Sequence, residues 1–171
     1  MSKKVGLFFG TTTGVTESVA ETIKELLGEE VVDLYDISEA EAGDFSEYEY
    51  LIVGSSTWNL GELQSDWDYF FENLDEIDFN GKTVAYYGPG DQIGYSGSFQ
   101  DAMGMLEEKI SSLGGETVGY TSIEGYDFSE SKAVRNENQF CGLAIDEDNQ
   151  SDLTEERVIA WGEQLKKEFK L

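Results

Sequence analysis

Short apolar runs and amphipathic stretches alternate along the whole chain. The apolar runs predict strands buried on both faces, at residues 4–9, 31–35, 50–54 and 82–87, with a fifth at 117–121. Between and after them, apolar residues at helical spacing predict helices at 16–28, 65–74, 98–113 and 152–169. This order of elements with short links predicts an α/β fold, in which helices cover both faces of a parallel sheet.

Each predicted helix has an apolar stripe that should face the sheet. The inward side chains are expected to be Val19, Ala20, Ile23, Leu26, Leu27, Trp67, Phe70, Phe71, Leu74, Val158, Trp161 and Leu165. Ser98, with Asp101 three residues later, predicts the N-cap of the third helix, and Gly114 follows its expected end.

The polar stretch 122–140 interrupts this pattern. A structureless loop of that length is uncommon inside a compact domain, and another apolar run follows it at 140–145. We therefore expect an insertion in the last strand of the sheet, with a small hairpin of its own. The length of 171 residues is otherwise typical of a single domain.

The chain is strongly acidic. Lys and Arg total 11, Asp and Glu total 36 and His is absent, so the formal net charge is −25. Such a surface repels nucleic acid and anionic lipid, and no apolar run approaches the ~20 residues of a membrane span. We expect no nucleic-acid binding and no membrane insertion. We expect instead a monomer that is steered toward proteins with basic patches.

The cysteine and histidine counts limit the chemistry further. Cys141 is the single cysteine, which indicates a reducing compartment: the cytoplasm, or the plastid stroma for a processed eukaryotic chain. Without His there is no Ser-His or Cys-His pair. Adjacent carboxylates such as Asp146 to Asp148 lack the glycine-punctuated spacing of a cation-binding loop. We expect no catalytic residue and no metal site.

The loop after the first strand is rich in threonine and glycine and leads directly into a helix. At the carboxyl end of a parallel strand, the free N–H groups and the dipole of that helix favour an anion. The loop lacks the motifs of triphosphate and dinucleotide sites. A phosphate monoester site and an ordinary turn capped by its first threonine fit this loop equally well. The candidate phosphate-binding residues are Thr11, Thr12, Thr13, Gly14, Val15 and Thr16.

Two further loops, at 55–63 and 88–95, each carry glycines and a large aromatic residue. In a doubly wound sheet of strand order 2-1-3-4-5, ligands bind at the switch between strands one and three, so all three loops are neighbours. Trp58 or Tyr95 alone is more simply explained as packing. Together, beside a phosphate loop, they predict a flat phosphorylated ligand whose ring is stacked between them.

These motifs resemble those of the flavodoxins, small electron carriers that bind flavin mononucleotide (FMN), in the long-chain form of cyanobacteria and algae. The resemblance extends over essentially the whole chain and rests on Gly10–Ser18 (GTTTGVTES), Thr57–Leu63 (TWNLGEL), Gly90–Tyr95 (GDQIGY) and Gly142–Asn149 (GLAIDEDN). It implies a five-stranded parallel sheet of order 2-1-3-4-5 with an insertion in the last strand. It also implies FMN as cofactor and low-potential one-electron transfer, with ferredoxin–NADP reductase and photosystem I as partners.

The resemblance also assigns roles to residues. Thr11 through Thr16 would hold the phosphate, Trp58 and Tyr95 would cover the inner and outer faces of the flavin ring, and Asp148 would approach the ribityl chain. Backbone groups of Pro89 through Asp91 would meet the pyrimidine edge of the ring. The full expected set around the ring adds Ser56, Thr57, Asn59, Leu60, Gly61, Pro89, Gly90 and Asp91.

Three positions should affect how tightly the cofactor is bound and how its reduced state is stabilised. Val15 stands where many flavodoxins have Lys, which leaves the phosphate cradle uncharged, and Pro89 stands where many have a residue with a backbone N–H. In the family, the peptide corresponding to Asn59–Leu60 reverses beside flavin N5 upon one-electron reduction. Because Asn tolerates positive φ less well than Gly, we expect Asn59→Gly to favour that state further.

Two other protein classes share this strand order. A flavodoxin-fold quinone reductase would bind NAD(P)H directly, and such enzymes are usually oligomeric, which the net charge opposes. A response-regulator receiver needs an acidic cluster after the first strand and a phosphoacceptor Asp after the third. Here those positions hold Gly10-Thr11 and Ser55-Ser56, which argues against a receiver.

Overall fold

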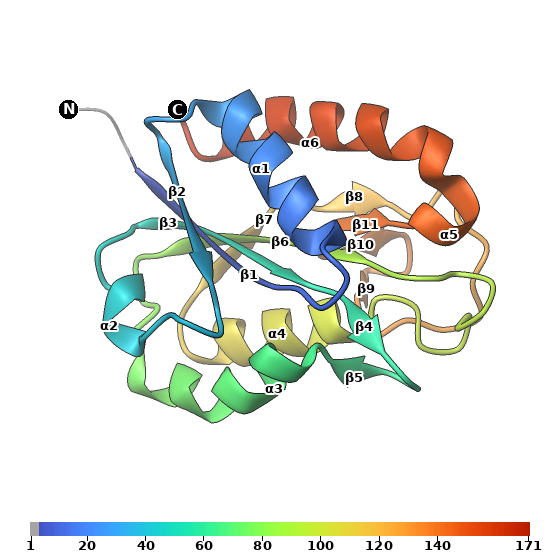
Figure 1. Ribbon diagram of the computed structural model, residues 1–171, viewed down its shortest axis with the longest axis horizontal. Coiled ribbons are helices and arrows are strands. Elements are labelled where there is room, and N and C mark those ends of the chain that lie inside the picture. Colours follow the sequence, from blue (N-terminus) through green and yellow to red (C-terminus); the bar gives the residue numbers. More distant parts are fainter. Residues whose placement is uncertain (1–3) are drawn as a thin grey trace.

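A parallel sheet forms the centre of the molecule in the computed structural model, which describes residues 4–171 (Figure 1). The strands run in the order β2-β1-β3-β6, and β7 and β11 both pair with the outer side of β6. Their bounds are β1 (Val5–Gly10), β2 (Val32–Asp36), β3 (Tyr50–Ser55), β6 (Thr83–Pro89), β7 (Glu116–Val118) and β11 (Leu143–Ile145). All of these pairings are parallel, so the predicted fold class and the order 2-1-3-4-5 are confirmed.

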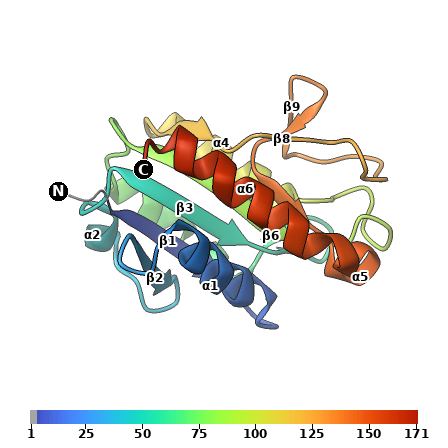
Figure 2. The same cartoon turned by 90° about the horizontal axis from the view of Figure 1, so that it is seen from above.

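Helices cover both faces of the sheet (Figures 1 and 2). On one face, α1 (Val15–Leu27) packs beside α6 (Thr154–Glu168). The other face carries α2 (Ala42–Phe45), α3 (Ser65–Phe70), the 3-10 helix η1 (Phe71–Glu76) and α4 (Asp101–Ser112). Every residue of β1 and β3 is buried between these two layers, which explains why the two strands are almost continuously apolar.

The last strand of the sheet is split, as predicted. β7 pairs with the first half of β6, where Thr83 lies opposite Glu116, and β11 pairs with its second half, where Tyr87 lies opposite Leu143. The chain between them forms a separate antiparallel sheet of β8 (Thr121–Ser122), β9 (Val134–Arg135) and β10 (Gln139–Phe140). The expected hairpin is β9–β10, and β8 adds a third strand to it.

Several element boundaries differ from the prediction. Ser98 is not an N-cap: α4 begins at Asp101, and Gln100 occupies the N-cap position with φ 63°. The expected helix at 65–74 changes from α-helix to 3-10 helix after Phe70, and Phe71 is only half-buried there. The predicted fifth strand ends early, because the chain turns at Gly119, φ 85°, toward the separate sheet.

The apolar stripes of the helices build the core largely as predicted. Trp67 and Trp161, one on each face of the sheet, are both fully buried. Cys141 is also fully buried as a small core residue, and burial raises the pKa of its thiol to about 12. Within residues 4–171, no helix has the length and apolar character needed to cross a membrane.

Candidate functional site

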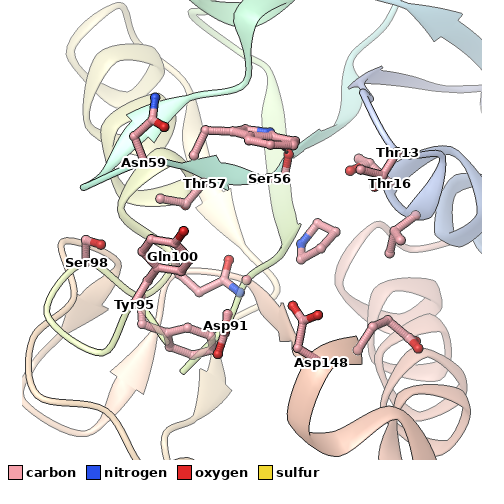
Figure 3. Close-up of a pocket in the computed structure, with 16 residues that line it drawn as sticks. Thr13, Thr16, Ser56, Thr57, Asn59, Asp91, Tyr95, Ser98, Gln100 and Asp148 are labelled. Atoms are coloured by element: carbon pink, nitrogen blue, oxygen red, sulfur yellow. Dashed lines mark hydrogen bonds between the residues drawn. The ribbon is translucent and has the colours of Figure 1, made fainter. Parts of the chain in front are cut away.

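A cavity of about 600 Å³ opens at the carboxyl end of the sheet, where the loops after β1, β3 and β6 meet (Figure 3). This volume is typical of small-molecule sites. Its walls are formed by Thr13, Val15, Thr16, Ser56, Thr57, Trp58, Asn59, Pro89, Gly90, Asp91, Tyr95, Ser98, Phe99, Gln100, Glu147 and Asp148. The three loops therefore converge at the strand switch point, as the strand order requires.

The helix that follows the first loop begins without a cap. Gly14 occupies the N-cap position of α1 with φ 93°, and no side chain accepts a hydrogen bond from the first turn. The Oγ1 atom of Thr11 instead accepts the N–H of Gly14 at 2.9 Å, within the loop itself. The ordinary capped turn is thus not what forms here. The first turn begins on the cavity wall, to which Val15 and Thr16 contribute, so an anion in the cavity can satisfy its free N–H groups.

Two buried side chains, those of Gln64 and Tyr87, anchor this first loop by hydrogen bonds. The Nε2 atom of Gln64 donates to Thr12 Oγ1 at 3.2 Å, while its Oε1 caps α3 by accepting the N–H of Asp66 at 3.0 Å. The hydroxyl of Tyr87 donates to the carbonyl of Thr16 at 2.8 Å. Gly10 leaves room for Gln64, because a Cβ at that position would lie 2.1 Å from its Oε1 atom. The loop is therefore anchored before any ligand binds.

The second loop is a small hairpin of β4 (Thr57–Trp58) and β5 (Glu62–Leu63). The indole N–H of Trp58 donates to Ser56 Oγ at 2.7 Å, which leaves a ring that is 36% exposed on the cavity wall. At the tip, Asn59 has φ 51° and Gly61 has φ 104°. Asn59 thus adopts the left-handed backbone conformation, with positive φ, that the proposed reversal of the Asn59–Leu60 peptide needs this residue to tolerate.

The third loop carries Tyr95, whose ring is 50% exposed (Figure 3). Asp91 shapes this loop: its Oδ1 atom accepts the N–H groups of Ile93 and Gly94, and its carbonyl accepts that of Tyr95. The hydrogen bonds to its carboxyl, led by the one from Gly94 and followed by those from Asn149 and Ile93, lower the pKa of Asp91. Pro89 has no backbone N–H, and the N–H of Gly90 is already bonded to the carbonyl of Ile145. Among these three described residues, Asp91 therefore has the free N–H.

Acidic side chains line the remaining wall. Glu147 and Asp148, at the start of α5 (Glu147–Gln150), line the cavity. Partial burial, and then the charges of Asp91, Asp146 and Glu147, raise the pKa of Asp148. No Lys or Arg is among the lining residues. An anion bound here would be held by neutral donors next to several negative charges.

The cavity includes most of the residues that the sequence identified. The predicted residues on its wall are Thr13, Val15, Thr16, Ser56, Thr57, Trp58, Asn59, Pro89, Gly90, Asp91, Tyr95 and Asp148. Thr11, Thr12, Gly14 and Gly61 belong to the same loops but are not on the wall, and Leu60 is 89% exposed at the hairpin tip. Those five residues do not line the cavity.

Sequence reasoning missed Ser98, Phe99, Gln100 and Glu147. The pattern predicts a helix that includes the first three, but α4 begins only at Asp101 and leaves them in the loop before it. Gln100 belongs to no motif that would mark it as a site residue. Gln100 is fully buried. Its Nε2 atom donates to the carbonyl of Gly88 at 2.8 Å, whereas its Oε1 atom has no partner among the described residues.

Together these features fit a flat ligand with a phosphate tail. The uncapped start of α1 provides donors for the tail, the aromatic side chains provide surfaces for a ring, and the unpaired Gln100 Oε1 offers an acceptor for a ring N–H group. An oxidised flavin ring has a single such N–H, on its pyrimidine edge. The residues that are present therefore fit FMN.

Comparison with known proteins agrees with this geometry. The family model described as Flavodoxin matches residues 7–161. The chain is 63% identical to a flavodoxin of Nostoc sp. over the full length of both, and 64% identical to one of Synechococcus elongatus over 98% of this chain and 99% of that protein. The crystal structure of a lysine-to-glycine variant of Fusobacterium nucleatum flavodoxin bound to FMN superposes with a TM-score of 0.92, at 33% identity and 98% coverage of each chain.

Proposed function

This chain belongs to the flavodoxin family, and from that premise we propose which residues hold its cofactor and which proteins it serves. It is an FMN-dependent electron-transfer protein and not an enzyme. When FMN is bound, its ring supplies the redox chemistry, and the protein positions and tunes that ring. The observation that carries the proposal is the convergence of an uncapped helix start, Trp58 and Tyr95 on one cavity.

We assign the phosphate to the first loop. The hydroxyls of Thr13 and Thr16 and the free N–H groups at the start of α1 are the donors, while Val15 contributes no charge. Thr11, Thr12 and Gly14 shape the loop around these donors. Such a cradle depends on the number and direction of its hydrogen bonds, because it contains no cation to attract the phosphate from a distance.

We assign the ring to the space between the second and third loops. Trp58 and Tyr95 exclude water from its faces, and Asp91 N–H and Gln100 Oε1 meet its polar edge. Ser56, Thr57, Asn59, Pro89 and Gly90 complete the wall, and the exposed Leu60 and the half-buried Gly61 continue the hairpin outside it. Asp148 stands near the ribityl chain.

The surroundings of the ring favour a low reduction potential. Asp91, Glu147 and Asp148 lie on the cavity wall, and the whole chain has a formal charge of −25. Negative charge close to a weakly hydrated ring opposes the addition of further negative charge. These charges support an electron carrier whose reduction potential is low for a bound flavin.

The partners are redox proteins, and we propose ferredoxin–NADP reductase and photosystem I among them. The exposed apolar side chains of Trp58 and Tyr95 line the cavity, and the exposed Leu60 and Ile93 belong to the same two loops. The abundant carboxylates would steer these loops toward a basic docking patch, so the association rate should fall as ionic strength rises. We place this activity in the cytoplasm, or in the stroma of a plastid.

We also propose that the whole chain acts as one domain and as a monomer. Ala133, Phe140 and Cys141, which come from the segment inserted between β7 and β11, are fully buried among residues of α3 and α4. This packing supports a shared core. The high net negative charge opposes contact between two copies.

Titration of the apoprotein with FMN tests the assignment. We expect flavin fluorescence to be quenched at one equivalent, and we expect Tyr95→Ala to weaken binding by about tenfold through loss of one stacked face. Tyr69→Ala is the matched control, because Tyr69 is 89% exposed and outside the cavity. NADPH alone should leave the flavin oxidised, whereas NADPH with the reductase should reduce it. Equal binding by both variants would contradict the site.

A further inference from the structure

The segment inserted between β7 and β11, residues 119–142 and here called the insertion, is hydrogen-bonded to the loop that carries Tyr95. The N–H groups of Ser129 and Glu130 donate to the carbonyl of Ser96 at 2.9 and 3.0 Å. The N–H of Lys132 donates to Asp101 Oδ1 at 2.8 Å. A row of main-chain donors in the insertion thus supports the stretch that runs from the third loop into α4.

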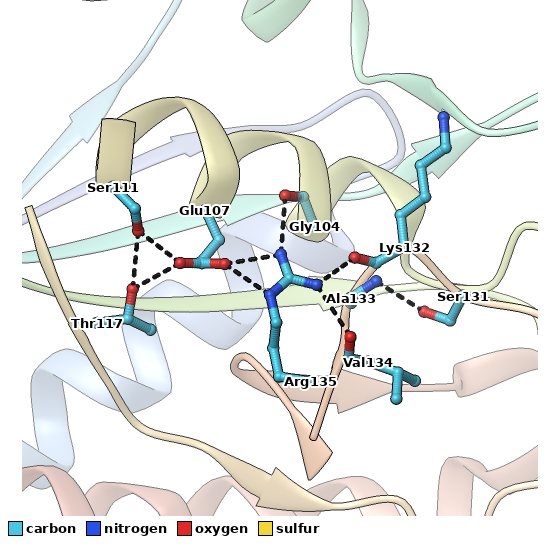
Figure 4. A network of polar contacts seen from close by, with 9 residues as sticks. All are labelled: Gly104, Glu107, Ser111, Thr117, Ser131, Lys132, Ala133, Val134 and Arg135. Carbon is cyan, nitrogen blue, oxygen red and sulfur yellow. Dashed lines mark hydrogen bonds and ion pairs between the residues drawn. The ribbon is translucent and has the colours of Figure 1, made fainter. Parts of the chain in front are cut away.

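Aromatic packing reinforces this contact. Phe99, which lines the cavity, packs against Tyr126 and Phe140 of the insertion with ring centroids 5.9 and 5.8 Å apart. At the far end, Arg135 is paired with Glu107 of α4 at 2.7 Å (Figure 4). The insertion is therefore fastened along the first half of α4, from Asp101 to Glu107, and up to the cavity wall.

Gln92 is the point at which these contacts meet. Its side chain is almost fully buried and is bonded at both ends: Nε2 donates to Asp146 Oδ2 at 2.7 Å, and Oε1 accepts the N–H of Asp127 in the insertion. Its own backbone N–H donates to the same oxygen of Asp146 at 3.1 Å. One side chain thus joins the third loop, the insertion and the end of β11.

The frame around Gln92 extends to residues on the cavity wall. Asp146 is fully buried, and the side chain of Asn149 donates both to Asp146 and, at 2.7 Å, to Asp91 Oδ1. The carbonyl of Asp91 in turn accepts the N–H of Tyr95. A buried carboxylate that is held by neutral donors is strongly ordered, because each lost donor leaves it partly unsatisfied.

We propose that Gln92 is a positioning residue that, with the insertion behind it, holds Tyr95 in place against the flavin. Gln92 does not line the cavity, so its effect on the cofactor passes through Asp146, Asp91 and the loop. The inference rests on the proposed function, and it gives the insertion a role in ordering the cofactor site before the cofactor binds.

The test is Gln92→Met, which keeps the length of the side chain but removes its donor and its acceptor. We expect FMN to dissociate about tenfold faster from this variant, since the lost bonds include one to a charged group. We also expect part of the flavin fluorescence to return and the bound-flavin absorption bands to shift, because Tyr95 is no longer fixed. Gln92→Asn, whose amide is too short to span both partners, should change the same quantities in the same direction if Gln92→Met does not fold.

Gln164→Met is the matched control. The Nε2 atom of Gln164 donates to the carbonyl of Tyr120 at 2.9 Å, so this variant also loosens the insertion, but at its start and away from the cavity. It should leave the FMN dissociation rate and fluorescence unchanged. Wild-type values in the Gln92 variants, or an equal change in Gln164→Met, would overturn the inference. If wild-type apoprotein fails to bind FMN, the proposed function itself is wrong.

Discussion

Asn59 shows how much depends on the backbone of a single residue. It lies at the tip of the β4–β5 hairpin with φ 51°, in a region that costs most residues about 1–2 kcal/mol and costs Gly almost nothing. Its side chain compensates in part by donating to Glu62 Oε2 at 2.8 Å, although that bond is exposed to water. The residue is therefore a compromise between a stable hairpin and freedom of the Asn59–Leu60 peptide.

Substitution of Asn59 should change the separation between the two one-electron midpoint potentials of bound FMN. We expect Asn59→Gly to widen it by roughly 80 mV, because stabilising the one-electron-reduced state by about 1 kcal/mol raises the first potential and lowers the second by about 40 mV each, and Asn59→Ala to narrow it. The measurement is a spectroelectrochemical titration. Asn73→Gly is the control, because Asn73 is an exposed asparagine in η1 and not on the cavity wall. The same separation in Asn59→Gly and Asn59→Ala would contradict this role.

Among the elements, the insertion is held to α4 by a partly buried ion pair. Glu107 accepts hydrogen bonds from Ser111, Thr117 and Arg135, and Arg135 also donates to the carbonyl of Gly104 (Figure 4). Burial alone would raise the pKa of Glu107, but these hydrogen bonds outweigh it and lower the pKa. The ionised carboxylate is thus the form that the fold stabilises.

The stabilising effect of Glu107 should depend on pH. Because its folded-state pKa is lowered, its contribution is present above the unfolded-state pKa and is lost as pH falls through the folded-state value. We expect Glu107→Gln to reduce the free energy of unfolding by about 2 kcal/mol at neutral pH and by much less at about pH 3, as measured by urea titration. Glu163→Gln, at the exposed pair with Lys166, should change little. Equal losses for Glu107→Gln at both pH values would contradict this account.

At the scale of the whole molecule, net charge and the binding site act against each other. The chain has a formal charge of −25, and the cavity wall has three carboxylates and no Lys or Arg. The phosphate of FMN is itself an anion. Long-range repulsion therefore opposes cofactor binding, while the hydrogen bonds of the first loop favour it at short range.

Salt should consequently strengthen the binding of FMN, which is the reverse of its effect at a cationic phosphate site. At physiological ionic strength the screening length is about 8 Å, short enough to weaken repulsion from most of the surface. Fluorescence titrations at low and high salt should show this gain for FMN and none for uncharged riboflavin. Val15→Lys should tighten FMN binding and reduce its salt dependence, whereas Glu21→Gln, the same charge change on the exposed side of α1, should have a smaller effect. Weaker FMN binding at high salt would contradict this view.

The sequence by itself determined the features that depend on local pattern. Alternating apolar runs and helical stripes specify the parallel sheet and its helices, because period and burial are linked. The split in the last strand followed from one long polar stretch, and Thr11–Thr16, Trp58 and Tyr95 were identified by their places after three strands. The order of parallel strands then brought these loops to one edge.

Only the tertiary structure decided how distant segments meet around that edge. Nothing in the sequence near Gln92 indicates a bond to Asp146, and nothing near Gln100 indicates a buried acceptor on the cavity wall. Ser98 has the sequence pattern of a helix N-cap, yet it lies on the cavity wall and α4 begins only at Asp101. The physical reason is that a buried polar group must be satisfied by whatever the fold brings near it, and that partner is set by packing and not by sequence neighbours.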